Sequence, residues 1–350
     1  MTLHLVTGGT GFLGRHLVAK LLEQGRDVRV LARQSSDVTG LEGAEIARGD
    51  ITSRDDLARA LDGVSRVFNL AGELADGKPA EHYEKVNHLA VVALAELAAE
   101  HGVERLIHTS HYFGLGRSGE PRSVPDFVND EFWTHDPGDM HDANEESQAN
   151  AENAINQRVS LSEQVLALIP TMMYGPEARS VSGRGDLAVG NRIVAMLADH
   201  AAGNYPGIPG DGRQWWNLVH VEDVAAAHVQ VMDADIESDA PEVWPPSIWA
   251  NWHYICGGEN VRLADLFERF GRLAGVSAPA LVKLKKGLLG RLFGGAEPVG
   301  RSKERFAIDS HSWAFSAAVA EKDWGYTHRS LDEGLEQTVA WMRSSGLLSQ

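Results

Sequence analysis

Three glycines stand three residues apart in the segment TGGTGFLG, residues 7–14. The apolar run LHLVT before them suits a buried parallel strand, and the amphipathic stretch after them suits a helix. In that setting Gly8 permits a tight turn, Gly11 lets the backbone approach a phosphate, and Gly14 lets the helix pack on the strand. Because the helix N-terminus then faces the phosphates, the spacing predicts a dinucleotide-binding loop. The predicted contacts of this loop are Gly8, Thr10, Gly11, Phe12, Leu13 and Gly14.

The end of the second predicted strand bears on which dinucleotide binds. That strand, DVRVLAR, closes on Arg33, 19 residues after Gly14. A carboxylate at this place would hold the ribose 2′-hydroxyl of NAD, whereas a guanidinium suits the 2′-phosphate of NADP. Ser35 and Ser36 add hydroxyl donors beside it. We therefore favour NADP(H) over NAD(H); the simpler alternative is an arginine that only faces solvent at a strand end.

Composition narrows the class of protein. At 350 residues, 43% of them hydrophobic, the chain is long enough for one large domain or two unequal lobes. A single cysteine, Cys256, excludes an intramolecular disulfide and suits a reducing cytoplasm. The chain opens on a strand and has no long apolar run, so we expect neither a signal peptide nor a transmembrane segment. The net charge of −17 opposes nonspecific nucleic-acid binding.

Strand and helix patterns alternate through the first half of the chain. The predicted strands cover 3–7, 27–32, 44–48, 65–70, 104–109 and 164–169, and the predicted helices 12–24, 53–62, 80–101 and 145–157. This alternation predicts an α/β fold with a Rossmann-type, doubly wound parallel sheet. We interpret residues 1–170 as an NAD(P)-binding domain. We interpret residues 171–350 as a smaller substrate-binding lobe from which some segments, such as 217–221, return to the sheet.

Further short segments follow the glycine loop in a fixed order. They are GDI at 49–51, VFNLAG at 67–72, Val86-Asn87, LIHTS at 106–110, PTMMYGP at 170–176, LVHVEDVAAAH at 218–228 and DWGY at 323–326. Together with the loop they resemble the extended short-chain dehydrogenase/reductase family, the NAD-dependent epimerase/dehydratase type, over nearly the whole chain. The resemblance implies a Rossmann domain, a C-terminal substrate domain and a homodimer formed through helices.

The resemblance also implies cofactor contacts beyond the loop. Asp50 and Ile51 would flank the adenine, and Pro170 and Thr171 would approach the nicotinamide. The other implied contacts are Leu70, Ala71, Gly72, Asn87, Thr109 and Gln148.

The catalytic residues of the family are replaced in this chain. The family's catalytic Ser or Thr lies one residue after a pair like Thr109-Ser110, and here that residue is His111. The Tyr-x-x-x-Lys motif matches a stretch that puts Asn144 at the tyrosine place and Gln148 at the lysine place. No lysine or tyrosine occurs across 113–173, so small shifts of alignment do not restore the pair. Asn144 cannot act as an acid or base near neutral pH, and Gln148 has no charge with which to tune one.

His111 is the first candidate for the missing proton donor, because an unperturbed imidazole gains and loses a proton near neutral pH. Ser110 and Tyr112 flank it. Successive residues of an extended segment point to opposite sides, which disfavours Tyr112, unless the segment forms a loop that turns Tyr112 toward the site. The acidic segment 135–146 can supply a second acid or base, or simply be a solvated loop with helix-capping carboxylates. We assign no metal site, although this segment offers His135, Asp139 and His141 as ligands.

The substrate lobe departs from the family's sugar-nucleotide members. Those commonly carry an Arg-Asp pair after a glycine turn, where the arginine meets the diphosphate; here Trp216 and Asn217 stand there. We therefore expect an apolar or aromatic substrate, contacted by Tyr174, Trp216 and Trp133. The alternative is that the tryptophans only fill the core of the lobe.

Two functions remain open from the residues alone. The first is an NAD(P)-dependent enzyme with a non-standard active site, acting on a small apolar or aromatic molecule by reduction or by a non-redox lyase, dehydratase or isomerase step. The second is a catalytically silent scaffold or sensor that binds the dinucleotide.

Overall fold

The computed structural model describes residues 2–112, 143–158, 165–235, 253–282 and 309–349. A seven-stranded sheet of order β10-β6-β5-β4-β1-β2-β3 forms its centre, and all neighbouring strands in it run parallel. The strands are β1 (Leu3–Thr7), β2 (Asp27–Ala32), β3 (Glu45–Arg48), β4 (Arg66–Asn69), β5 (Arg105–Thr109), β6 (Val165–Pro170) and β10 (His253–Cys256). The predicted α/β class with a doubly wound parallel sheet is confirmed.

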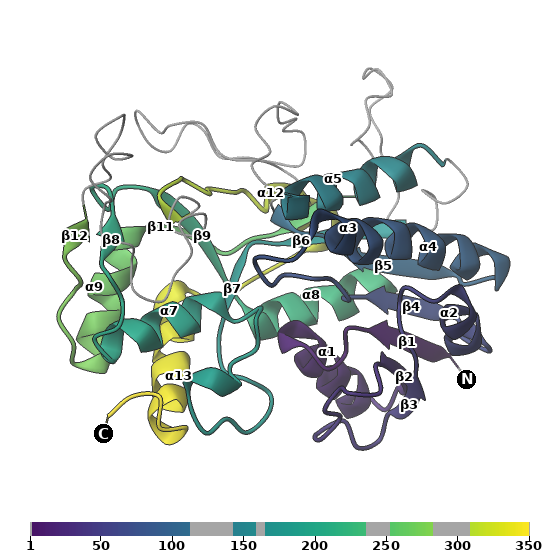
Figure 1. The fold of residues 1–350 in the computed structure, drawn as a ribbon, viewed down its shortest axis with the longest axis horizontal. Coiled ribbons are helices and arrows are strands. Elements are labelled where there is room, and N and C mark those ends of the chain that lie inside the picture. The colour runs from purple at the N-terminus through teal and green to yellow at the C-terminus, as the bar shows by residue number, and fades with distance from the viewer. Residues whose placement is uncertain (1, 113–142, 159–164, 236–252, 283–308, 350) are drawn as a thin grey trace.

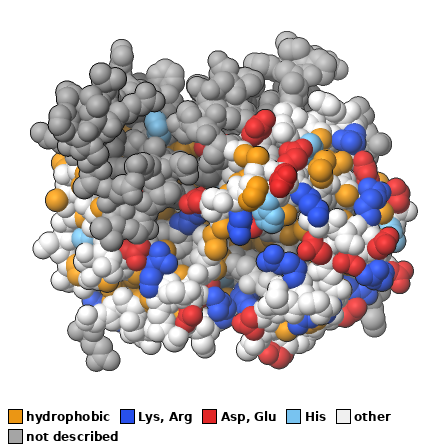
Figure 2. Space-filling model, in the orientation of Figure 1, with side chains coloured by type: hydrophobic (Ala, Val, Ile, Leu, Met, Phe, Trp, Pro, Cys, Tyr) orange, Lys and Arg blue, Asp and Glu red, His pale blue; other side chains and the backbone are white. Residues whose placement is uncertain are grey.

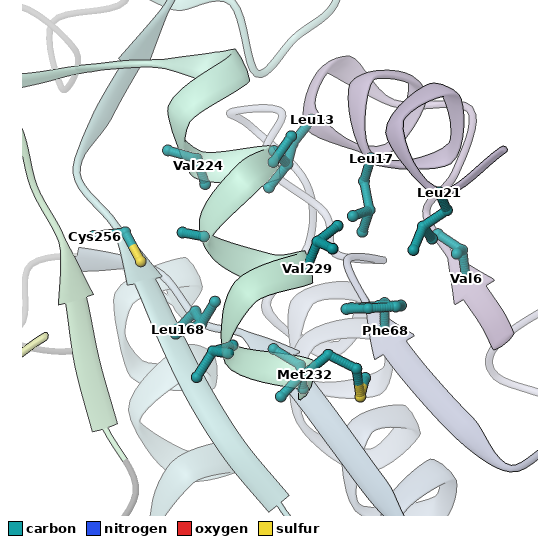
Figure 3. Close-up of a cluster of buried hydrophobic side chains, with 14 of the residues drawn as sticks. Val6, Leu13, Leu17, Leu21, Phe68, Leu168, Val224, Val229, Met232 and Cys256 are labelled. Atoms are coloured by element: carbon teal, nitrogen blue, oxygen red, sulfur yellow. The ribbon is translucent and has the colours of Figure 1, made fainter. Parts of the chain in front are cut away.

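Helices cover both faces of this sheet (Figure 1). On one face lie α1 (Phe12–Glu23), α8 (Val221–Asp233) and α12 (Ala318–Trp324); on the other lie α2 (Arg54–Leu61), α4 (Ala90–Glu100) and α5 (Ala143–Asn156). Side chains alternate along each strand, so Val6 packs with the first layer and its neighbour Leu5 with the second. Figure 3 shows the first layer, where Leu17 of α1 and Val229 of α8 meet over Phe68.

The predicted helix at 80–101 forms as three consecutive pieces. These are α3 (Ala80–Tyr83), a π-helical turn η1 (Glu84–Leu89) and α4. A π-helical turn takes up an extra residue and often lies at a functional site. Here it carries Lys85 and Asn87, which both border the cavity described below.

The remaining elements form a smaller lobe. A three-stranded sheet of order β11-β9-β7 contains β7 (Met172–Tyr174), β9 (Trp215–His220) and β11 (Glu259–Arg262), and β8 (Ile208–Pro209) pairs with β12 (Leu281–Val282). Around them lie the short η4 (Arg184–Asp186) and the helices α7 (Arg192–Ala201), α9 (Leu263–Ala274) and α13 (Leu331–Ser344). Trp216, Trp313 and Phe267 are fully buried in the core of this lobe.

The strand expected near 217–221 forms as β9, but its predicted return to the large sheet is wrong. β7 begins two residues after β6 ends and turns out of the large sheet, and β9 pairs with β7 there. The strand that does return is β10, which pairs with β6. Among the helices of the described residues, none has both the length and the apolar character needed to cross a membrane.

Candidate functional site

A cavity of about 680 Å³ lies along the carboxyl ends of the parallel strands. Residues that follow β1, β2, β4, β5 and β6 line it, together with the first turns of α1 and α7. This edge is where ligands of open parallel sheets bind. The structure brings every predicted cofactor contact to this one cavity: Gly8, Thr10, Gly11, Phe12, Leu13, Gly14, Arg33, Asp50, Ile51, Leu70, Ala71, Gly72, Asn87, Thr109, Gln148, Pro170 and Thr171.

The glycine loop fits a pyrophosphate. A Cβ on Gly14 would lie 2.2 Å from the carbonyl oxygen of Gly8, and Gly8 itself has a φ of 68° and backbone atoms of Leu70 within 2.6 Å of such a Cβ. The close approach brings the N-terminus of α1 to the cavity. Gly11 caps that helix with no side-chain hydrogen bond, and its first turn holds no acidic residue. Its amide groups are therefore available to an anion.

Two arginines fasten the loop that follows β2. Arg15 is almost fully buried and donates to the carbonyls of Thr10, Asp37 and Thr39. Arg48 donates to the carbonyls of Arg33 (2.7 Å) and Ser36 (3.1 Å). The loop is thus held by its backbone.

The side chains of this loop lie at the nucleotide end of the cavity. Arg33 and Ser36 border the cavity there, and Arg33 is exposed. Burial alone would raise the pKa of nearby Asp50, but hydrogen bonds from Thr52 and the charges of Arg33 and Lys85 lower it below its usual value. This end of the cavity therefore holds both a carboxylate and a guanidinium.

His111 and Tyr112 line the same cavity, with their rings stacked at a centroid distance of 4.4 Å and an interplanar angle of 28°. The expectation that they point to opposite sides is wrong, because β5 ends at Thr109 and strand alternation no longer applies. Tyr112 also packs edge-on against Trp313 and Phe315, 5.3 and 5.8 Å away. The lobe core therefore fixes the plane on which His111 rests.

Asn144 and Gln148 lie one turn apart on α5 but differ in surroundings. Gln148 borders the cavity, whereas Asn144 is not among the lining residues of the described chain. Asn87 of η1 donates to Asn144 Oδ1 (3.0 Å) and Ser147 Oγ (3.2 Å), and its own Oδ1 accepts from the amide of Glu73. Asn144, which stands at the position of the family's tyrosine, therefore links α5 to η1 through its side-chain amide.

A buried polar cluster lies beneath this segment. Ser110 borders the cavity and donates its hydroxyl proton to Glu152 of α5, whose other oxygen lies 3.6 Å from His253 of β10. Burial raises the pKa of Glu152 to about 8. Burial and the charge of His253 lower the pKa of His108 to about 4, and Asn69 donates to that ring. At neutral pH the cluster therefore holds a protonated carboxyl and a neutral imidazole.

The predicted substrate contacts fare differently. Trp216 borders the cavity, and its Nε1 donates to the carbonyl of His311 (3.3 Å). Tyr174 is fully buried away from the cavity lining, under α13, because its hydroxyl fills the space beside Gly334, where a Cβ would lie 2.0 Å from it. Trp133 lies outside the described residues.

The metal candidates His135, Asp139 and His141 also lie outside the described residues. Within the part of the chain that is described, no cluster of three His, Cys, Asp or Glu side chains could hold a metal ion. His220 and His228 have structural partners: His220 caps α8 through Glu222, and His228 contacts Thr109 at 2.8 Å.

Arg192 is one of the lining residues that were not predicted from the sequence. Arg192 starts α7, a helix that was not predicted, and borders the cavity from the side of the lobe. The sequence signal for α7 is Asn191, a residue type that is common at helix N-caps, followed by apolar residues at helical spacing that are buried in the structure: Ile193, Val194, Met196 and Leu197.

Comparison with known proteins identifies the family. A family model described as the NAD dependent epimerase/dehydratase family matches residues 4–245. The chain belongs to this family. Its resemblance to the extended short-chain dehydrogenases is thereby confirmed, and membership implies a nicotinamide dinucleotide as cofactor and a small-molecule substrate.

Two curated relatives match this chain over nearly their full length. Sterol demethylase protein B from Methylococcus capsulatus is 26% identical over 98% of this chain and 99% of its own. The 2-alkyl-3-oxoalkanoate reductase of Stenotrophomonas maltophilia is 26% identical over 96% and 98%. Among solved structures, that of gox2253 is 29% identical, covers 100% of both chains and has a TM-score of 0.77. The chain is therefore similar to family members throughout its length.

Proposed function

We propose that this chain is an NADP(H)-dependent reductase of a small, largely apolar or aromatic carbonyl compound, with His111 as proton donor. The observation that carries the proposal is the cavity itself. One space joins the pyrophosphate loop to the stacked rings of His111 and Tyr112 and to Trp216. Relatives named for sterols and for 2-alkyl-3-oxoalkanoates support an apolar substrate.

A bound NADPH would supply the hydride for the carbonyl carbon, and the chain supplies the proton and the positioning. The oxygen that gains charge needs a donor, and the imidazole of His111 gives its proton to it, so that carbonyl, hydride and proton together yield an alcohol. Gln148 holds the ribose hydroxyls as a neutral amide. Trp216 and Tyr112 border the cavity and make its wall aromatic, which favours an apolar substrate and excludes water.

The preference for NADP(H) rests on Arg33 and Ser36 at the nucleotide end of the cavity. A guanidinium pairs with phosphate oxygens through two parallel hydrogen bonds, which a ribose hydroxyl does not offer. Asp50 is the competing group, since a carboxylate in that region repels a 2′-phosphate.

We also propose a homodimer formed through the helices on the α4–α5 side. The proposal follows the family resemblance, and Leu89, the last residue of η1 beside α4, is 54% exposed on that side. Light scattering of the purified protein measures this directly, and a monomer mass would contradict it.

The alternative function is a silent dinucleotide binder, and the bonding of Asn144 to Asn87 favours it, because it removes the tyrosine place from the cavity. Turnover separates the two. NADPH oxidation is followed with a panel of aromatic ketones, alkyl ketones and 3-oxo acids, and with UDP-sugars as substrates that the proposal excludes. Oxidation with an apolar member supports the reductase; firm NADPH binding with no turnover of any member supports the silent binder.

His111→Ala then tests the proton donor. We expect turnover to fall by about 10²- to 10⁴-fold with nearly unchanged NADPH affinity, because the glycine loop is untouched. Tyr112→Phe is the matched control, since it keeps the ring under His111 and removes only the hydroxyl. Loss in Tyr112→Phe with near-normal turnover in His111→Ala would transfer the role to Tyr112.

A further inference from the structure

Arg192 stands apart from the other cations of the cavity. In the described chain, Arg15, Arg33, Lys85 and Arg179 also border it, and the charges of all four act on Asp37 or Asp50 at the nucleotide end. Arg192 instead starts α7, in the lobe that carries Trp216. Under the proposed function, in which the lobe contacts the substrate, we place this charge at the substrate end.

The guanidinium of Arg192 is only partly used. Nη2 donates to the carbonyl of Leu74 and lies 3.5 Å from a carboxylate oxygen of Asp76. Nη1 is buried and has no hydrogen-bond partner among the described residues. A buried guanidinium nitrogen without an acceptor is costly, so an acceptor is expected from a ligand. Asp76 is itself 46% exposed and neutralises the charge only weakly.

Arg192 shares the cavity with apolar side chains of the lobe core. Its chain neighbour Ile193 borders the cavity and is buried in that core, and Met172 and Trp216 of the same core also line the cavity. The N-terminus of α7 adds a partial positive charge at this point. A single cation at the edge of an apolar wall suits a molecule with one anionic group and a greasy body.

We propose that Arg192 binds the carboxylate of an amphipathic acid, so that the substrates are apolar carboxylic acids whose reacting carbonyl lies toward His111. Nη2 stays bonded to the 73–76 segment and fixes the guanidinium plane, while Nη1 donates to the acid. The inference rests on the proposed function and narrows its substrate class.

The test compares an acid with its uncharged analogue in the NADPH-bound protein. Titration calorimetry with decanoate and decanamide should show the acid bound at least about tenfold more tightly by the wild type, since a charge-assisted hydrogen bond is lost in the amide. Equal affinities for the two compounds would contradict a carboxylate bound by Arg192 and would remain consistent with an apolar substrate. Binding of neither compound would contradict the proposed apolar substrate itself.

Variants of Arg192 test whether this residue causes the preference for the acid over the amide. Arg192→Gln should bring the ratio of the two affinities to about one, and Arg192→Lys should keep part of it. Arg184→Gln is the control, because Arg184 lies in the same lobe, pairs with Asp199 at 2.9 Å and is outside the cavity lining. An acid preference that persists in Arg192→Gln overturns the assignment. If that variant melts well below the wild type, Arg192→Lys and the wild-type comparison still decide.

Discussion

The two ends of the cavity are made from different parts of the polypeptide. The nucleotide end is formed mainly by the backbone. Gly8 and Gly14 lie in close contact, the first amides of α1 face the cavity, and arginine side chains hold the loop after β2 by its carbonyl groups. The reaction end is side chains, carried by the segment after β5, by α5 and by α7. Backbone geometry follows directly from residue spacing, whereas the position of a side chain depends on what else packs beside it.

Asn144 and Gly14 illustrate the difference. The close contact of Gly14 with Gly8 is set by their spacing alone, and the structure has it as expected. Asn144 has the spacing that should align it with Gln148, yet its amide bonds to Asn87 of another helix. Spacing gave its place on the helix but not its partner.

The largest effect on stability and cofactor binding is expected at the contact between the backbones of Gly14 and Gly8. Gly14→Ala places a Cβ 2.2 Å from the carbonyl of Gly8, and neither backbone can yield without moving α1 away from β1. We expect a loss of about 3 kcal/mol or more in unfolding free energy, together with loss of NADPH binding. Gly185→Ala is the control, because a Cβ there meets nothing within 4 Å. Near-normal stability and NADPH affinity in Gly14→Ala would contradict the conclusion that close backbone contacts form the nucleotide end.

The second effect concerns the buried polar cluster of Ser110, Glu152 and His253 beneath the reaction end. The pKa of Glu152 is raised from an ordinary 4.5 to about 8, so the folded state keeps a proton that the unfolded state has lost. Stability from this group is present at low pH and is lost as pH rises through about 8. The pKa values of His108 and His228 are lowered to about 4, so these groups destabilise the folded state only as pH falls below 6.5, and their contribution is constant above that pH.

Between pH 6.5 and 8 the wild type should therefore lose roughly 2 kcal/mol of unfolding free energy, about 1.4 per pH unit. Urea unfolding at the two pH values measures this. Glu152→Gln keeps an acceptor for Ser110 but has no proton to lose, so its stability should be flat across the window. Glu146→Gln, exposed on the same helix, should keep the wild-type slope. Equal slopes in Glu152→Gln and the wild type would place the titrating group elsewhere.

The smallest effect belongs to the rim of the nucleotide end, where a side chain supplements the backbone. Arg33 is exposed, so solvent weakens its pairing with a phosphate. Arg33→Asp should weaken NADPH binding by about tenfold and leave NADH binding unchanged or improved. Arg54→Asp makes the same change of charge outside the cavity lining and should not alter the ratio. Equal wild-type affinities for the two cofactors would remove the basis for the preference.

The same division explains what could be predicted from sequence. The predicted bounds of β1 and β2 match those in the structure, because short apolar runs and glycine turns are local signals. The stacking of His111 on Tyr112 and the burial of Tyr174 could not be predicted, since the first requires the strand end and the second requires Gly334 of α13. The exchange of β9 for β10 in the large sheet likewise depends on pairing between distant segments.

Because β10 comes late in the chain but pairs with β6, the large sheet cannot be completed until most of the chain has been synthesised. α8 and β10 are translated after residue 220, yet they cover Leu17 and Phe68 and complete the edge beside β6. Until they leave the ribosome, only α1 covers this face of the sheet, and the apolar side chains that pack on α8 stay exposed. We expect a fragment that stops at residue 170 to aggregate rather than to fold as a separate cofactor-binding unit, so chaperone demand should be concentrated in the interval between the syntheses of β6 and β10.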